Sequence, residues 1–129
     1  MPLKLSLKPG ETFVVNGAVV RNGERRGVLL LETQARVLRD KDIMLPEEAN
    51  SPAREAYFAV MQLYLTGEDS GPRYDAAIDS LAQVLTDDSL NDEEREGVLA
   101  VSRAMASGDL YRALGASRKL IAAETARTA

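Results

Sequence analysis

The stretch KPGETFVVNGAVV, residues 8 to 20, contains two chain reversals separated by one short apolar segment. The tetrapeptide KPGE is typical of a turn, because proline presets the backbone of the second position and glycine tolerates a positive φ at the third. Asn16-Gly17 stands between two apolar triplets, and this pair favours the type I′ turn of a β-hairpin. The stretch therefore predicts strands at 13–15 and 18–20, with another strand from Leu3 to Leu7 ahead of the first turn.

The chain continues in the same way up to residue 39. Asn22-Gly23 marks another reversal before Gly27 to Leu31, and Glu32-Thr33-Gln34 leads into Ala35 to Arg39. Five short strands so close together are typical of an antiparallel meander. Such a small set leaves edge strands whose backbone groups are unpaired. We therefore expect those edges to be covered, either by a second copy of the chain in a homodimer or by the rest of the chain.

After Pro46 the apolar period changes from two residues to about 3.6, which indicates helices. Capping residues and glycine stops delimit them. The expected helices run from Ser51 to Gly67, from about Arg73 to near Asp87, from Asn91 to Gly108, and from Leu110 onward, with Ala126 to Ala129 frayed. The predicted fold class is α+β: a five-stranded antiparallel β module over residues 1–45, followed by a bundle of three to four helices over residues 46–129.

The composition excludes several classes of function. The 129 residues include no cysteine and no histidine, which excludes disulfides, thiol nucleophiles, histidine triads and the common zinc sites. The acidic clusters lie where helix caps and solvated faces account for them, and no glycine-rich phosphate loop is present. We therefore expect no enzyme, no catalytic residues, no metal and no cofactor.

The N-terminal sequence and the apolar runs predict the compartment. MPLKLSLKPG lacks the basic-then-apolar pattern of a secretory signal. No apolar run reaches the roughly 20 residues that a membrane span needs. We therefore expect a cytoplasmic protein without a membrane partner.

Charge divides unevenly along the chain. Residues 1–45 contain eight Lys or Arg against five Asp or Glu, a net charge of +3, whereas residues 46–129 contain eight against fifteen, a net charge of −7. A polyanion, if one binds, is expected to meet the basic first part.

The cations of the β module have two interpretations. Lys4, Lys8, Arg36 and Arg39 are distributed over both faces of a thin sheet. Arginine suits phosphate groups and stacks on unpaired bases, so one interpretation is a surface for single-stranded RNA. The other is that these residues pair with neighbouring acids such as Glu11 and protect an edge strand from aggregation. The pattern alone leaves both interpretations open.

Tyr57, Met61 and Tyr64 recur at helical spacing in the first predicted helix. The simpler interpretation is that they form helix core. The alternative is a partner-binding surface, in which the acidic helices hold another protein in a helix groove.

The sequence also resembles known families. From MPLKLSLKPGETFVVNGAVVRNG through RRGVLLLETQARVLRDKDIMLPEEANSPAREAYFAVMQLYL, the chain resembles the FlbT family of flagellin-expression regulators. Within it, PGETFVVNG, GVLLL and VLRDKDI also resemble the carbon storage regulator (CsrA) family of small RNA-binding dimers. The first resemblance implies a post-transcriptional regulator of the 5′ untranslated leader of flagellin mRNA, commonly a repressor of its translation or stability, with a FlaF-like flagellar protein as a partner.

The second resemblance implies where RNA would bind. It implies an interleaved dimer in which the first strand of one chain lies beside the last strand of the other. The basic residue before the PGE turn falls on Lys8 and the arginine that closes the last strand falls on Arg39, whereas Lys4 and Arg36 are near them by strand spacing. Leu7 stands where that family often has a basic residue. The alternative function is a protein-binding adaptor or chaperone that acts on flagellin or a flagellar partner through the helical half.

Overall fold

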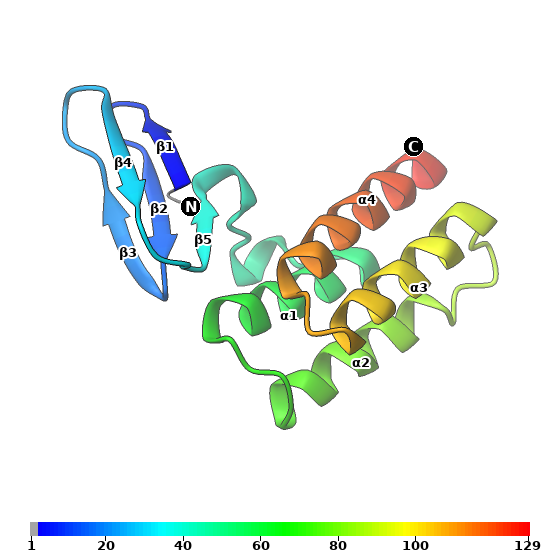
Figure 1. Cartoon of the computed structure of the whole chain (residues 1–129). Helices are drawn as coiled ribbons and strands as arrows, with labels where there is room; N and C mark the ends of the chain where they lie inside the picture. Colours follow the sequence, from blue (N-terminus) through cyan, green and yellow to red (C-terminus); the bar gives the residue numbers. More distant parts are fainter. Residues whose placement is uncertain (1–2) are drawn as a thin grey trace. The chain divides into compact units, whose positions relative to one another are not determined.

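The computed structural model describes residues 3–129 and divides the chain into two compact units, with the boundary after Ile43. Within the described residues, the first unit contains five strands and a short 3₁₀ helix, η1 (Asp40–Asp42), as Figure 1 shows. The second unit contains another 3₁₀ helix, η2 (Pro46–Glu48), and four α-helices. The prediction of an α+β fold, with a β-rich first part and a helical second part, is therefore confirmed.

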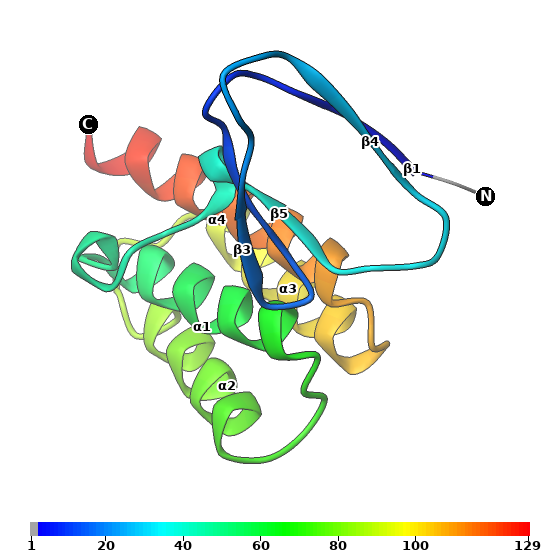
Figure 2. The ribbon, with the colours of Figure 1, turned by 90° about the vertical axis from the view of Figure 1, so that its left-hand side faces the viewer.

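The five strands form two antiparallel sheets. β1 (Leu3–Leu7) pairs with β4 (Gly27–Leu31), and Figure 2 shows these two strands running together. In the other sheet, β2 (Thr12–Val15) is central, with β3 (Ala18–Arg21) on one side and β5 (Val37–Arg39) on the other. The predicted strands are thus present, but their pairing divides them into a two-stranded and a three-stranded sheet.

A small apolar cluster joins the two sheets. Leu5 and Leu7 of β1 are buried together with Phe13 of β2. The alternation along β1 explains this choice, since Leu5 and Leu7 point inward whereas Lys4 and Ser6 are exposed. Partly buried residues of β2, β4 and β5 complete the cluster: Val15, Leu29, Leu31 and Val37.

The turn at Asn16-Gly17 fixes one end of the second sheet, where β2, β3 and β5 meet. Asn16 has φ of 48° and Gly17 of 83°, the left-handed values that a type I′ turn requires. Asn16 also bonds to Arg36, because its N–H donates to the Arg36 carbonyl at 2.9 Å and its Oδ1 accepts from the Arg36 N–H at 2.9 Å. The Arg36 N–H thus bonds to a side chain, Asn16, instead of to the backbone of a neighbouring strand. As a result, β5 begins at Val37 instead of the expected Ala35.

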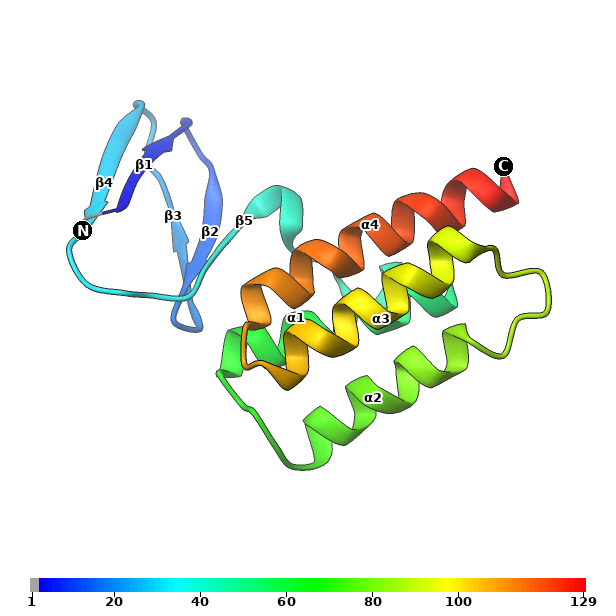
Figure 3. The same cartoon turned by 45° about the vertical axis from the view of Figure 1, so that its right-hand side comes forward.

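The helical unit is an up-and-down arrangement, visible in Figure 3, in which α1 packs against α2 and α4, and α3 packs against α4. The four helices are α1 (Pro52–Thr66), α2 (Pro72–Val84), α3 (Asp92–Ala106) and α4 (Leu110–Thr128). The predicted caps are present: the Ser51 hydroxyl accepts from Arg54 N–H, and Asn91 and Glu94 form a reciprocal capping box. No helix among residues 3–129 is both long and apolar enough to cross a membrane.

The C-terminal end of α4 differs from the expectation. The helix continues to Thr128, so the predicted fraying from Ala126 is wrong. The reason is the Arg127 guanidinium, which donates to Glu94 Oε1 at 2.6 Å, Ser89 Oγ at 2.7 Å and Asp87 Oδ2 at 3.1 Å. Because the Glu94 side chain is almost fully buried, this bond ties the last turn of α4 to the first turn of α3.

Candidate nucleic-acid interface

A pocket of about 400 Å³ lies in the β unit, and five charged or polar residues line it: Lys8, Glu11, Arg39, Asp40 and Lys41. They come from the turn after β1, the end of β5 and the 3₁₀ helix η1. The antiparallel register of β2 and β5 brings these segments together, because Arg39 lies opposite Phe13, near the start of β2. Lys8 and Arg39, the two RNA contacts that the CsrA resemblance implies, therefore line the same pocket.

The β1–β2 turn is held in place on both sides. The Glu11 N–H donates to the Lys8 carbonyl at 3.1 Å, and the Lys8 N–H donates to Glu11 Oε1 at 2.9 Å. Asn22 fastens the turn to the next loop, because its Nδ2 donates to the Lys8 carbonyl at 2.7 Å. Gly10 has φ of 70°, which glycine adopts without strain. These bonds fix the backbone from which Lys8 projects.

Arg39 is held by Glu11. Its Nε donates to Glu11 Oε2 at 2.8 Å, and its Nη2 lies 2.7 Å from the same oxygen and donates to the Ser6 carbonyl at 2.7 Å. The Glu11 side chain is 13% exposed, whereas that of Arg39 is 29% exposed. The carboxylate is thus largely covered while the guanidinium keeps a face toward solvent. Arg39 therefore pairs with a neighbouring acid, as one of the two interpretations predicts. The same residue also lines the pocket.

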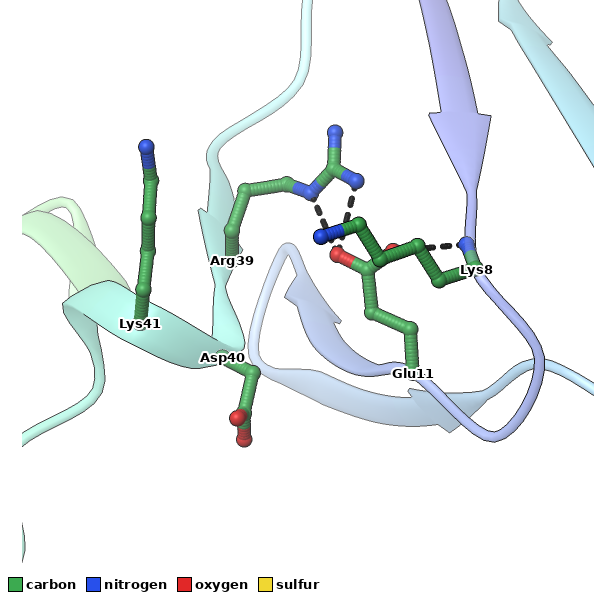
Figure 4. A pocket seen from close by; sticks show the side chains of 5 residues that line it. All are labelled: Lys8, Glu11, Arg39, Asp40 and Lys41. Atoms are coloured by element: carbon green, nitrogen blue, oxygen red, sulfur yellow. Dashed lines mark hydrogen bonds and ion pairs between the residues drawn. The ribbon is translucent and has the colours of Figure 1, made fainter.

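The electrostatics of the pair favour the ionised carboxylate. The hydrogen bond from the Lys8 backbone N–H lowers the pKa of Glu11 most, and the hydrogen bond from Arg39 lowers it further. Both bonds favour the charged form, so Glu11 and Arg39 remain an ion pair at neutral pH. Figure 4 shows Lys8 on one side of Arg39 and Lys41 on the other, while the Asp40 carboxylate points away from them. The pocket lining thus contains three cations and two acids, of which Glu11 is paired with Arg39.

The other two candidate cations are placed elsewhere in the β unit. Lys4 is exposed near the start of β1, opposite Leu30, and does not line the pocket. Arg36 lies beside Asn16 at the β2–β3 hairpin, at the end of β2 away from Glu11. Its Nε is buried without a hydrogen-bond partner among the described residues. The structure therefore groups Lys8 with Arg39 and leaves Lys4 and Arg36 outside the pocket.

The candidate partner-binding residues of α1 are buried. Tyr57, Met61 and Tyr64 are 3%, 4% and 7% exposed. Met61 Sδ accepts from the Met44 N–H at 3.3 Å, and the ring of Tyr64 lies 5.8 Å from that of Tyr111. This burial favours the helix-core interpretation of the stripe, because a partner could touch these side chains only after the helices rearrange.

Three pocket residues, Glu11, Asp40 and Lys41, were not selected as site residues from the sequence. Lys41 lies two positions after Arg39, within the VLRDKDI segment that resembles the CsrA family, although only η1 directs it to the pocket. Glu11 has a weaker signal, since it appeared only as one of several acids that could neutralise the cations. Residues 28 positions apart form the Glu11–Arg39 pair, and no local pattern specifies such a contact. No cluster of metal ligands occurs among residues 3–129.

The family model and the similar proteins that match this chain all carry the same family name. The family model described as "Flagellar protein FlbT" matches residues 3–128. The chain belongs to the FlbT family. A Caulobacter sp. FlbT named "Probable flagellum biosynthesis repressor protein FlbT" is 48% identical, with 98% of this chain and 96% of that protein covered. The "Flagellum biosynthesis repressor protein FlbT" of Caulobacter vibrioides is 46% identical over 98% of this chain and 89% of its own length.

A more distant FlbT relative covers the same length. The "Probable flagellum biosynthesis repressor protein FlbT" of Rhodopseudomonas palustris (strain TIE-1) is 35% identical, with 96% of this chain and 95% of that protein covered. The FlbT match therefore spans both structural units. No solved structure matches the chain.

Proposed function

We propose that this chain represses flagellum biosynthesis by binding the 5′ untranslated leader of flagellin mRNA and modulating its translation or stability. The single observation that carries the proposal is the grouping of Lys8, Arg39 and Lys41 around one pocket of the β unit. The names of the FlbT relatives, flagellum biosynthesis repressors, support the regulatory part. The RNA target follows from the sequence resemblance and from the chemistry of the pocket.

The pocket suits an unpaired RNA segment. Phosphate contacts supply most of the affinity of proteins for nucleic acid, and lysine and arginine provide them. An arginine that is fixed on one edge and partly exposed can meet a phosphate or stack on a base. The pocket volume of about 400 Å³ is large enough for a nucleotide rather than a whole duplex. The leader would therefore bind through an unpaired stretch, and a bound leader would be less accessible for translation.

The proposal assigns no catalysed reaction and no cofactor to the protein. It places the protein in the cytoplasm, where the message is translated. A homodimer, the commonest symmetric oligomer, would present two such pockets to one leader. Lys4 and Arg36 would then contribute to a longer RNA path over the β units, outside the pocket itself.

The test is a mobility shift with a flagellin leader RNA. The double variant Lys8→Glu, Arg39→Glu should lose most of the binding, because it replaces two cations of the pocket by acids. The matched control is the double variant Arg112→Glu, Lys119→Glu, which makes the same charge change on exposed residues of α4. Circular dichroism verifies that each variant is folded. Equal affinity of the pocket variant and the wild type would refute the site.

An alternative function is a protein-binding adaptor or chaperone for flagellin or a FlaF-like partner. The observation that favours it is a set of exposed apolar side chains on, or next to, the helices of the acidic unit: Ile78, Leu85, Leu99 and Tyr111. Apolar side chains that gather into one exposed patch are typical of protein interfaces. If this function is correct, the double variant Ile78→Ser, Leu99→Ser loses flagellin or FlaF in a nuclease-treated pull-down with the full chain, while its RNA binding is unchanged.

A further inference from the structure

The Glu11 carboxylate occupies one edge of the arginine that the RNA site depends on. A guanidinium has five N–H groups in a fixed plane. In Arg39, Nε and Nη2 contact Glu11 Oε2, and Nη2 also donates to the Ser6 carbonyl. The contacts named therefore use two of the three nitrogens and leave Nη1. Figure 4 shows that third nitrogen on the side away from the carboxylate.

This arrangement limits how Arg39 can meet a ligand. An arginine without an intramolecular partner can bind a phosphate or a guanine edge through two parallel N–H hydrogen bonds. With its Nε–Nη2 edge bound to Glu11, Arg39 has only Nη1 and the exposed face of the guanidinium to offer. The side chain is also immobilised, since the bonds to Glu11 and Ser6 approach from two directions. Less conformational entropy is then lost when RNA binds.

The Glu11 carboxylate is itself held in one orientation, so it also holds the Arg39 guanidinium in one orientation. Its Oε1 accepts from the Lys8 backbone N–H at 2.9 Å, which leaves Oε2 for the guanidinium. The backbone of Lys8 and the guanidinium of Arg39 are therefore linked through one carboxylate. Neutralising the charge of Arg39 requires only the contact through Glu11 Oε2, so the bond from the Lys8 N–H to Oε1 serves to orient the carboxylate.

We infer that Glu11 is a positioning and specificity-determining residue for single-stranded RNA: it fixes the guanidinium of Arg39 so that the pocket accepts one phosphodiester geometry and rejects loosely bound polyanions. The inference rests on the proposed function and deepens it. Removal of the carboxylate has two opposite effects. The pocket gains one unit of positive charge, which strengthens binding to any RNA, and Arg39 loses its fixed orientation, which weakens the preference for the leader.

The experiment compares the affinities for a flagellin leader and for a scrambled RNA of equal length, by fluorescence anisotropy at one salt concentration. The measured quantity is the ratio of the two dissociation constants, because a general effect of charge changes both alike. Glu11→Gln should reduce this preference by between about twofold and a hundredfold, the range expected for contacting residues that act together. It should also increase the affinity for the scrambled RNA. Glu32→Gln is the matched control, since it removes one exposed acid from the same unit.

A double-variant cycle separates positioning from charge. In an Arg39→Gln background, Glu11→Gln should no longer change the preference, because the residue it positions is absent. If Glu11→Gln changes the preference equally in both backgrounds, or not at all in the wild type, the inference is overturned. Glu11→Asp keeps the charge and shortens the side chain, so it provides a second variant with the same expected loss of preference if Glu11→Gln folds poorly. If Arg39→Gln alone leaves leader binding unchanged, the proposed RNA site itself is wrong.

Discussion

The salt dependence of RNA binding tests the pocket quantitatively. Neutralisation of Z phosphates on a single strand makes log K fall with log of the salt concentration with a slope of about −0.7Z. Three cations line the pocket, Lys8, Arg39 and Lys41, so each protomer should contribute a slope of about −2. Between 50 and 200 mM salt, affinity should then fall roughly twentyfold per protomer. A dimer that uses both pockets should double the slope.

The double variant Lys8→Gln, Lys41→Gln leaves one cation in the pocket. Its slope should be about −0.7 per protomer, and its affinity should fall only about threefold over the same salt range. The assay is anisotropy of a labelled flagellin leader at four or more salt concentrations, with Lys119→Gln on α4 as a single-charge control. A double variant with the wild-type slope would show that phosphates do not meet these lysines. An equal change in the control would show that binding follows overall charge instead of the pocket.

Three further predictions concern stability. Asn91→Ala removes the acceptor of the Glu94 N–H, a bond of 2.9 Å, and should reduce the free energy of unfolding by about 1 kcal/mol, measured by urea denaturation. Leu114→Ala removes a fully buried side chain and should cost about 2–5 kcal/mol, whereas Leu85→Ala, at a residue 50% exposed, should cost much less; equal losses would contradict the packing of α4. The pKa of Glu11 lies below its ordinary value of 4.5, so its stabilising contribution is present above that pH and is lost as the pH falls through the lower folded pKa. Glu11→Gln should therefore flatten the acid side of the stability profile, and an unchanged profile would contradict the ion pair.

Local signals explain why so much of the fold was predictable. Turn residues such as Asn16-Gly17 need backbone angles that few residues adopt, so they locate hairpins without help from the rest of the chain. Helix caps are equally local, since Asn91 and Glu94 are three residues apart. The start of β5 was predicted two residues early, because the Asn16 side chain takes over the pairing of Arg36.

These local signals do not predict contacts between residues that are far apart in the sequence. The capping box identified Glu94, but not its burial or its bond to Arg127, 33 positions away. For the candidate site, the sequence singled out Lys8 and Arg39 and could not say that Glu11 joins them. A charged residue has the same local signature whether it faces solvent or an ion pair, so such pairs follow only from the packing.

The sequence by itself determined the order and type of the elements, the basic and acidic halves, and the absence of cysteine and histidine chemistry. These properties depend on composition and on backbone preferences over a few residues. Only the tertiary structure decided that β1 pairs with β4 while β2 pairs with β5, and so that three cations and Glu11 surround one pocket. Strand pairing depends on which apolar faces bury each other, a property of the whole unit that no single segment encodes.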